Sequence, residues 1–167
     1  MNTGPNVFSG SHMSRLNTHS LSSISSTTSK SSAQDDTEDG VSLRVLVADD
    51  ELLNRTLLER ILTKHGHEVV TAEDGGAALD MAERVKPDVL LLDLSMPTMD
   101  GMEVLAIIRS GQRDIPTDMP VIVLTGFDEK DVGAACRGFG VVDVVTKPIS
   151  LDMLLTVLAR VTKRGKD

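Results

Sequence analysis

From residue 43 onward the chain alternates short apolar runs with amphipathic stretches, and this alternation limits its possible folds more than any other feature. Each apolar run has the length of a buried strand, and the stretches between the runs carry apolar residues at helical spacing. The pattern predicts strands at 43–48, 69–72, 88–93, 120–125 and 141–146, and helices at 52–65, 75–85, 101–109, 128–137 and from 150 onward. A strand followed by a helix, five times over, predicts a parallel sheet with right-handed crossovers and helices on both faces.

The apolar content of the runs indicates where each strand lies in the sheet. The runs at 43–48, 88–93 and 120–125 are apolar at nearly every position, as parallel strands buried on both faces must be. Five units of this kind fit the doubly wound order 2-1-3-4-5 of a flavodoxin-like α/β fold. In such sheets ligands bind at the carboxyl ends of the strands, near the point where the strand order reverses. The residues directly after the strands are therefore the first candidates for function.

Polar residues follow four of the five predicted strands at the point where each apolar run ends. Asp49 and Asp50 follow the first strand, Asp93 ends the third, Thr125 ends the fourth, and Lys147 follows the fifth. Because the carboxyl ends of parallel strands meet at one edge of the sheet, three carboxylates, a hydroxyl and an ammonium are expected to converge there.

The chemistry of this set predicts a hard cation and a nucleophilic carboxylate. Three carboxylates within a few ångström repel one another unless positive charge lies among them. An all-oxygen set of ligands that leaves positions for water and phosphate oxygens is typical of Mg²⁺. A carboxylate beside Mg²⁺ and Lys147 could form an aspartyl-phosphate, with Mg²⁺, Lys147 and Thr125 stabilising the oxygens of the transferred phosphoryl group.

Each residue also has a simpler structural interpretation. Asp49 and Asp50 could cap the helix that follows them, because a helix N-terminus favours negative charge. Thr125 is a common residue in strands, and a lone lysine such as Lys147 is usually a solvated surface charge. Only the combination of all five positions favours the functional interpretation.

Composition excludes several classes of function. With 17 Lys and Arg against 25 Asp and Glu, the 167-residue chain carries a net charge of −8. That charge argues against a nucleic-acid or anionic-lipid partner, which requires a basic face. One Cys excludes an intramolecular disulfide. No apolar run approaches the roughly 20 residues of a membrane span, and the N-terminus lacks the apolar core of a signal peptide. We therefore expect a cytoplasmic protein.

The first 40 residues differ from the rest of the chain. They contain 11 Ser and 5 Thr, and their few apolar residues follow no period. Such a segment cannot bury enough apolar surface to offset its chain entropy. We predict a disordered Ser/Thr-rich tail over 1–40 and a folded domain over 41–167. The tail is interpreted as an inert linker, with a docking or phosphorylated tail as the alternative.

Four segments together resemble the receiver domain of two-component response regulators, over about residues 43–163. They are Val45–Glu51 (VLVADDE), Asp93–Gly101 (DLSMPTMDG), Val123–Gly126 (VLTG) and Thr146–Pro148 (TKP). The resemblance implies that Asp93 accepts a phosphoryl group from the phosphohistidine of a histidine kinase or phosphotransfer protein. This function is that of a signalling phosphoacceptor and not of an enzyme that turns over a separate substrate.

The same resemblance implies a role for each site residue. Mg²⁺ would be held by Asp50, Asp93 and the backbone carbonyl of Ser95, with Asp49 acting through water. Lys147, Thr125 and the backbone at Gly126 would contact the phosphoryl oxygens, and the Lys147–Pro148 peptide bond would be cis. Ser95 and Phe127 would flank the path of the hydrolytic water, where the bulk of Phe127 is expected to slow loss of the phosphate.

The sequence departs from the family pattern at positions tied to output. Val144 replaces the usual Tyr or Phe three residues before Lys147, Gly126 replaces the common Ala, and Gly140-Val141 replaces the usual Gly-Ala. Without an aromatic ring to couple to Thr125, we expect phosphorylation to act on the segment 126–140. The expected face for an unidentified downstream protein is then the fourth helix, the fifth strand and the last helix.

Three alternatives remain open at this point. The chain could be the receiver portion of a hybrid kinase or larger regulator, although within this sequence no output domain fits after the last predicted helix. An aspartyl-phosphate phosphatase would carry a second Asp two residues after the nucleophile, where this chain has Ser95. A pure interaction protein would lack one or more of the site residues.

Overall fold

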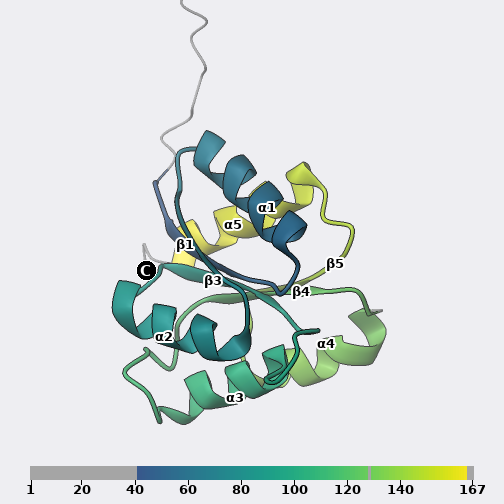
Figure 1. Cartoon of the computed structure of the whole chain (residues 1–167). Helices are drawn as coiled ribbons and strands as arrows, with labels where there is room; N and C mark the ends of the chain where they lie inside the picture. The colour runs from purple at the N-terminus through teal and green to yellow at the C-terminus, as the bar shows by residue number, and fades with distance from the viewer. Residues whose placement is uncertain (1–40, 128, 165–167) are drawn as a thin grey trace, which may run out of the picture. The chain divides into compact units, whose positions relative to one another are not determined.

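The computed structural model describes residues 41–127 and 129–164, which form a single five-stranded sheet with five helices. The sheet has the order β2-β1-β3-β4-β5 and every pair of neighbours is parallel, which confirms the predicted fold (Figure 1). The predicted tail at 1–40 lies outside the described residues, so the division at residue 41 stays a prediction. The elements are β1 (Arg44–Ala48), α1 (Leu52–Lys64), β2 (Glu68–Ala72), α2 (Gly75–Val85), β3 (Val89–Asp93), α3 (Gly101–Ser110), β4 (Val121–Thr125), α4 (Glu129–Gly138), β5 (Asp143–Thr146) and α5 (Leu151–Arg164).

Helices cover both faces of the sheet, with α1 and α5 on one side and α2, α3 and α4 on the other (Figure 1). Alternate residues of the central strands point into the two layers: Leu46 and Leu90 pack with α2 and α3, whereas Val45 and Leu91 pack with α1 and α5. This two-sided burial explains why β1, β3 and β4 have nearly continuous apolar sequences. Within residues 41–127 and 129–164, none of the helices is long and apolar enough to cross a membrane.

The sequence pattern of α1 combines two apolar rows, and the structure buries one of them. Leu58 and Leu62 pack against the sheet, whereas Leu53 and Leu57 are 75% and 58% exposed. The row through Leu53 and Leu57, which has the same helical spacing, is therefore the exposed one. Positions one residue apart on a helix differ by about 100° in direction, so only one of two adjacent rows can face the sheet.

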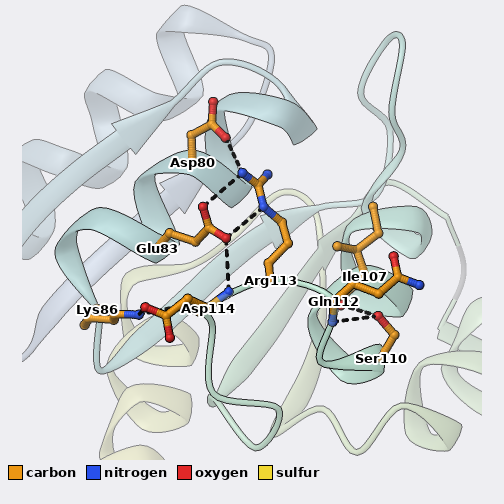
Figure 2. A network of polar contacts seen from close by, with 8 residues as sticks. All are labelled: Asp80, Glu83, Lys86, Ile107, Ser110, Gln112, Arg113 and Asp114. Atoms are coloured by element: carbon orange, nitrogen blue, oxygen red, sulfur yellow. Dashed lines mark hydrogen bonds and ion pairs between the residues drawn. The ribbon is translucent and has the colours of Figure 1, made fainter.

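The loop between α3 and β4 is fastened to α2 by a group of charged side chains. Figure 2 shows Arg113 reaching from this loop to two carboxylates of α2, with nitrogen–oxygen distances of 2.7 Å to Asp80 and 2.9 Å to Glu83. Lys86 at the end of α2 binds Asp114 of the same loop at 2.7 Å. These contacts lie at the edge of the sheet where β4 begins. They hold α2 and the α3–β4 loop together, away from the carboxyl ends of the strands.

Candidate functional site

The sheet topology brings the predicted site residues to one edge. β1 and β3 are neighbours and run in the same direction, with Ala48 opposite Leu92, so Asp49 follows one strand beside the place where Asp93 ends the other. In the second half of the sheet Thr125 lies opposite Thr146, and Lys147 follows directly. The site is thus assembled from the ends of four separate strands.

Three carboxylates form the centre of this edge. One oxygen each from Asp49, Asp50 and Asp93 lies within 4.8 Å of the others. Asp49 and Asp93 are buried, whereas Asp50 is exposed. Burial of like charges is unfavourable without a compensating cation, and an all-oxygen donor set suits Mg²⁺. The residues at this edge therefore fit a magnesium ion.

The ammonium of Lys147 bridges the two buried carboxylates. Its Nζ donates to Asp49 Oδ2 at 2.7 Å and to Asp93 Oδ2 at 3.1 Å. Partial burial works against the charged ammonium, but the hydrogen bonds to Asp49 and Asp93 outweigh it and raise the pKa of Lys147. Burial raises the pKa of Asp93, and this effect exceeds the opposite contributions of the Ser95 amide and Lys147. Lys147 thus stays charged beside the predicted phosphoacceptor.

The loop after β3 holds Asp93 from its backbone side. The Ser95 N–H donates to Asp93 Oδ1 at 3.0 Å, and the Gly101 N–H donates to the Leu94 carbonyl at 3.1 Å. A Cβ at Gly101 would overlap the Asp93 carbonyl oxygen, so only glycine lets α3 begin this close to the strand end. Gly75 at the start of α2 is equally crowded, because its Cβ would lie 2.8 Å from the Met99 carbonyl oxygen. The loop that carries Ser95 is therefore enclosed by two helix starts.

Thr98 in this loop has a backbone conformation that β-branched residues rarely adopt. Its φ is +70°, and the Met99 N–H donates to the Pro97 carbonyl across it at 2.7 Å, which is the pattern of a strained γ-turn. We expect Thr98→Gly to raise the free energy of unfolding by about 1 kcal/mol, because glycine adopts this φ without steric cost. Urea denaturation measures the free energy of unfolding. The control is Thr117→Gly at another exposed threonine, which should not raise the free energy of unfolding. A lower free energy of unfolding in Thr98→Gly than in wild type would contradict the prediction.

Thr125 and the residues after it lie at the same edge in a separate arrangement. Thr125 is fully buried, and its hydroxyl accepts a hydrogen bond from the Phe127 N–H at 3.0 Å. Its backbone carbonyl accepts from the Lys147 N–H at 2.7 Å, and the Lys147–Pro148 peptide bond is cis. Gly126 is exposed and Phe127 is 55% exposed. The hydroxyl of Thr125 is therefore engaged with its own loop, next to the carboxylate cluster.

Ser95 and Val144 complete the set of predicted residues. Ser95 is exposed at the start of the β3–α3 loop, which is compatible with its predicted place beside the path of water. Val144 on β5 is half-buried and packs on the side of the sheet covered by α2, α3 and α4. The roles in metal binding, phosphoryl contact and hydrolysis that the resemblance implies for these residues stay predictions.

Asp49 contributes both to the start of α1 and to the site. The first residue before α1 is Glu51, which makes no side-chain capping bond. Instead its N–H donates to Asp49 Oδ1 at 2.9 Å, while the other Asp49 oxygen binds Lys147. Asp49 therefore holds the start of α1 with one oxygen and the site lysine with the other.

Two residues of α1 contact the site and were not predicted from the sequence. The Asn54 amide nitrogen lies 3.4 and 3.2 Å from the two carboxylate oxygens of Asp49. Arg55, with only 12% of its side chain exposed, donates from Nη1 to the Asp49 backbone carbonyl at 2.8 Å. Their position could have been predicted from the sequence, because residues in the first turn of a helix that starts at a strand end lie close to that end. The polar residues Asn54 and Arg55 lie between the leucines that mark α1 as a helix in the sequence.

Comparisons with known proteins give consistent results. The family model of the response regulator receiver domain matches residues 45–159. Response regulator MprA of Mycobacterium bovis is 38% identical over 126 residues, which are 75% of this chain and 53% of MprA. Among solved structures, the Vibrio cholerae chemotaxis protein CheY4 matches with a TM-score of 0.66 and 30% identity, over 72% of this chain and 98% of CheY4. NtrX of Brucella abortus matches with a TM-score of 0.68 and 28% identity, over 75% of this chain and 28% of NtrX.

These matches differ in how much of each relative they include. The chain spans about half the length of the MprA relatives, but nearly the whole of CheY4. The family match at residues 45–159 includes the four strand ends that form the site. By its family match, its fold and its sequence identity to MprA, this chain belongs to the response regulator receiver domains of two-component systems.

Proposed function

We propose that Asp93 accepts a phosphoryl group from a histidine kinase or phosphotransfer protein in a Mg²⁺-dependent reaction, and that this changes a protein-binding face. The observation that carries the proposal is the buried Asp93 carboxylate, which shares the Lys147 ammonium with Asp49 and has oxygens of Asp49 and Asp50 within 4.8 Å. A structural carboxylate has no need of two like-charged neighbours, whereas a metal-assisted phosphoacceptor does.

In the proposed reaction a carboxylate oxygen of Asp93 forms a bond to phosphorus while the bond between phosphorus and the donor's histidine nitrogen breaks. The electron pair of that bond stays on the imidazole nitrogen, and the imidazole takes up one proton from solvent and leaves as the neutral group. Lys147 stands beside Asp93 and neutralises charge on the transferred oxygens. The Thr125 hydroxyl would reach a phosphoryl oxygen by giving up its hydrogen bond with Phe127.

Asp49, Asp50, Asp93 and the Ser95 carbonyl would hold Mg²⁺ at this edge. When bound, the ion would supply positive charge to the oxygens of the phosphoryl group and would orient them for in-line attack. The side chains of this protein contribute the negative cluster that attracts the ion. Lys147 contributes a fixed positive charge on the other side of Asp93.

The direct test is phosphorylation with a small donor. The 167-residue chain is incubated with Mg²⁺ and acetyl phosphate, and the intact mass is measured. We expect one added phosphoryl group in the wild-type chain and none in Asp93→Asn or in the presence of EDTA. Addition to Asp93→Asn, or addition that is independent of Mg²⁺, would reject the proposal.

A groove beside the site favours a protein as the donor. It has a volume of about 410 Å³, lies between α1 and α5, and is lined by Leu57, Leu151 and Lys147 among others. Leu57 is 58% exposed and Leu151 is 43% exposed, an unusual amount of apolar surface next to a charged centre. We propose that the donor protein packs an apolar helix face here while its phosphohistidine reaches Asp93.

Leu57→Glu tests the donor surface. We expect this change to slow phosphotransfer from a purified kinase or phosphotransfer protein at least tenfold, because it places a charge in an apolar contact. Phosphorylation by acetyl phosphate should remain at the wild-type rate. Thr56→Glu, an exposed neighbour outside the groove lining, is the matched control and should behave as wild type. Equal slowing with both donors would assign Leu57 to the chemistry and contradict a docking role.

For the downstream partner we propose the face formed by α4, β5 and α5. The C-terminal end of α4 is held, because Arg109 Nε donates to the Phe139 carbonyl at 2.8 Å and Cys136 is buried with its Sγ 3.8 Å from Met102 Sδ. Gly126 lies before α4 in open space, since a Cβ added at this residue would have no neighbouring atom within 4 Å. We propose that movement on phosphorylation concentrates ahead of this held end, near Gly126.

Hydrogen exchange with and without beryllofluoride, a phosphoryl mimic, tests this face. Phosphorylation is expected to draw Thr125 toward the site and to order the segment behind it. We expect protection to increase within 126–140 and to change little in α1 and α2. A change confined to α1 and α2 would move the proposed partner surface to the other side of the molecule.

Three further points concern enzyme activity, location in the cell and the length of the whole protein. A phosphatase lacks its acid/base residue here, since the position two residues after Asp93 is Ser95. We therefore propose a phosphoacceptor that is not an enzyme in its own right, and a cytoplasmic location. Because the chain spans about half the length of the MprA relatives, our second proposal is that it is the receiver portion of a hybrid kinase or larger regulator.

A further inference from the structure

The side chain of Asn54 lies between the carboxylates of Asp49 and Glu51 at the start of α1. Its amide nitrogen lies 3.4 and 3.2 Å from the two oxygens of the buried Asp49 and 3.1 Å from Oε2 of the exposed Glu51. It also lines the groove that contains Lys147. Asn54 therefore connects the first turn of α1 with a carboxylate of the proposed metal site.

Three donors hold the Asp49 carboxylate, and they differ in which of its two oxygens they contact. The Glu51 N–H binds Oδ1, and Lys147 binds Oδ2. The Asn54 amide contacts both oxygens, from a helix that is itself packed on the sheet through Leu58 and Leu62. Glu51 and Lys147 each hold one oxygen, and the Asn54 amide adds a contact to both, which further restricts rotation of the carboxylate plane.

The neutrality of the amide matters as much as its position. Lys147 orients Asp49 but subtracts from the negative charge that attracts a divalent cation. Lys147 is also shared with Asp93, and in the proposed reaction it turns to the phosphoryl group. Asn54 orients Asp49 without changing the charge of the site, and nothing in the proposed chemistry requires it to leave.

We infer that Asn54 is a positioning residue that sets the Mg²⁺ affinity of this receiver by fixing the orientation of Asp49. The inference rests on the proposed function, and it assigns Asn54 no contact with the phosphoryl group. Hydrogen-bonding partners of metal-binding carboxylates commonly change metal affinity by ten- to a hundredfold when they are removed. Because Glu51 and Lys147 still hold Asp49, we expect a change of about tenfold, at the lower end of this range.

The competing interpretation is that Asn54 only stabilises the start of α1 through Glu51. The two roles separate in a thermodynamic cycle. A purely structural residue contributes equally to the metal-free and Mg²⁺-bound protein, so its removal lowers stability and leaves the dissociation constant unchanged. A positioning residue contributes more to the Mg²⁺-bound protein, so its removal weakens Mg²⁺ binding.

The experiment measures the Mg²⁺ dissociation constant of the full chain by isothermal titration calorimetry. Asn54→Ala removes the amide, and Asn54→Leu removes it while keeping a side chain of similar shape. We expect both variants to bind Mg²⁺ about tenfold more weakly than wild type. Thr56→Ala, on an exposed position of the same helix, is the matched control and should bind Mg²⁺ as wild type does.

Phosphorylation by acetyl phosphate provides the second readout. The Mg²⁺ concentration for half-maximal rate should rise in both Asn54 variants, whereas the rate at saturating Mg²⁺ should stay within about twofold of wild type. Wild-type Mg²⁺ affinity in either folded variant would overturn the inference. If the wild-type chain itself fails to bind Mg²⁺ or to gain a phosphoryl group, the proposed function fails instead, and the two failures are thereby distinguished.

Discussion

Lys147→Met is expected to lower the free energy of unfolding of the metal-free protein by about 2 kcal/mol at neutral pH. Methionine keeps the apolar part of the lysine chain but removes the ammonium, which leaves Asp49 and Asp93 buried without a cationic partner. Breaking a buried ion pair usually costs about 3–5 kcal/mol, and the 24% exposure of Lys147 reduces that figure through solvent screening. Urea denaturation in EDTA measures the change.

Acid provides an internal check on this result. Without Lys147 the pKa of Asp93 should rise further, because the lysine lowers it in the wild-type protein. Protonation then removes the uncompensated charge, so the difference between variant and wild type should shrink as the pH falls. A difference that is constant with pH would mean that lost packing, and not lost charge, destabilises the variant.

The same variant should be impaired in chemistry. Removing a fixed charge beside a transferring group typically slows the reaction by about 10²–10³-fold. We therefore expect Lys147→Met to be phosphorylated by acetyl phosphate at least a hundredfold more slowly, even at saturating Mg²⁺. This sets it apart from the Asn54 variants, in which saturating Mg²⁺ restores the rate.

Asp50→Asn is expected to raise the melting temperature of the metal-free protein and to abolish its response to Mg²⁺. Asp49, Asp50 and Asp93 repel one another in the folded protein, so removing one charge relieves the strain. In the wild type, Mg²⁺ at ten times its dissociation constant should add about 1.4 kcal/mol, because it binds only the folded site. Thermal denaturation followed by circular dichroism, with EDTA and with Mg²⁺, measures both effects.

The matched control for this charge removal is Asp118→Asn. Asp118 is also exposed but lies in the α3–β4 loop, at the opposite edge of the sheet from the carboxylates. It should leave the Mg²⁺ response at the wild-type value. A metal-free melting temperature of Asp50→Asn that is equal to or below that of wild type would count against a strained acidic cluster.

The sheet of this protein can be predicted from the sequence because each strand is marked by its own short apolar run. The continuous apolar runs of β1, β3 and β4 mark buried parallel strands, and the rule that parallel strands end at one edge places Asp49, Asp93 and Lys147 together without further information. Local pattern does not decide which of two apolar rows on α1 faces the sheet, since Leu57 and Leu58 are equally apolar. The exposure of Leu57 and the contact of Asn54 with Asp49 both depend on that rotation.

Side-chain orientation is the other quantity that sequence leaves open. The position of Thr125 at the end of β4 follows from the pattern, but its bond with the Phe127 N–H depends on the path of the next loop. The φ of Thr98 likewise departs from the ordinary preference of threonine, because the close starts of α2 and α3 determine the course of the loop. Such features come from packing across the chain and not from neighbouring residues.

Asp49 and Lys147 are 98 positions apart in the chain, and this separation has a consequence for folding during synthesis. During synthesis the acidic strand ends emerge first, and the lysine that neutralises them arrives with the edge strand β5. A nascent chain that has released β1 to β4 thus carries its carboxylates without their ammonium. Docking of β5 gains both a sheet partner and a countercharge, so the last strand is also the one that makes the acidic edge stable.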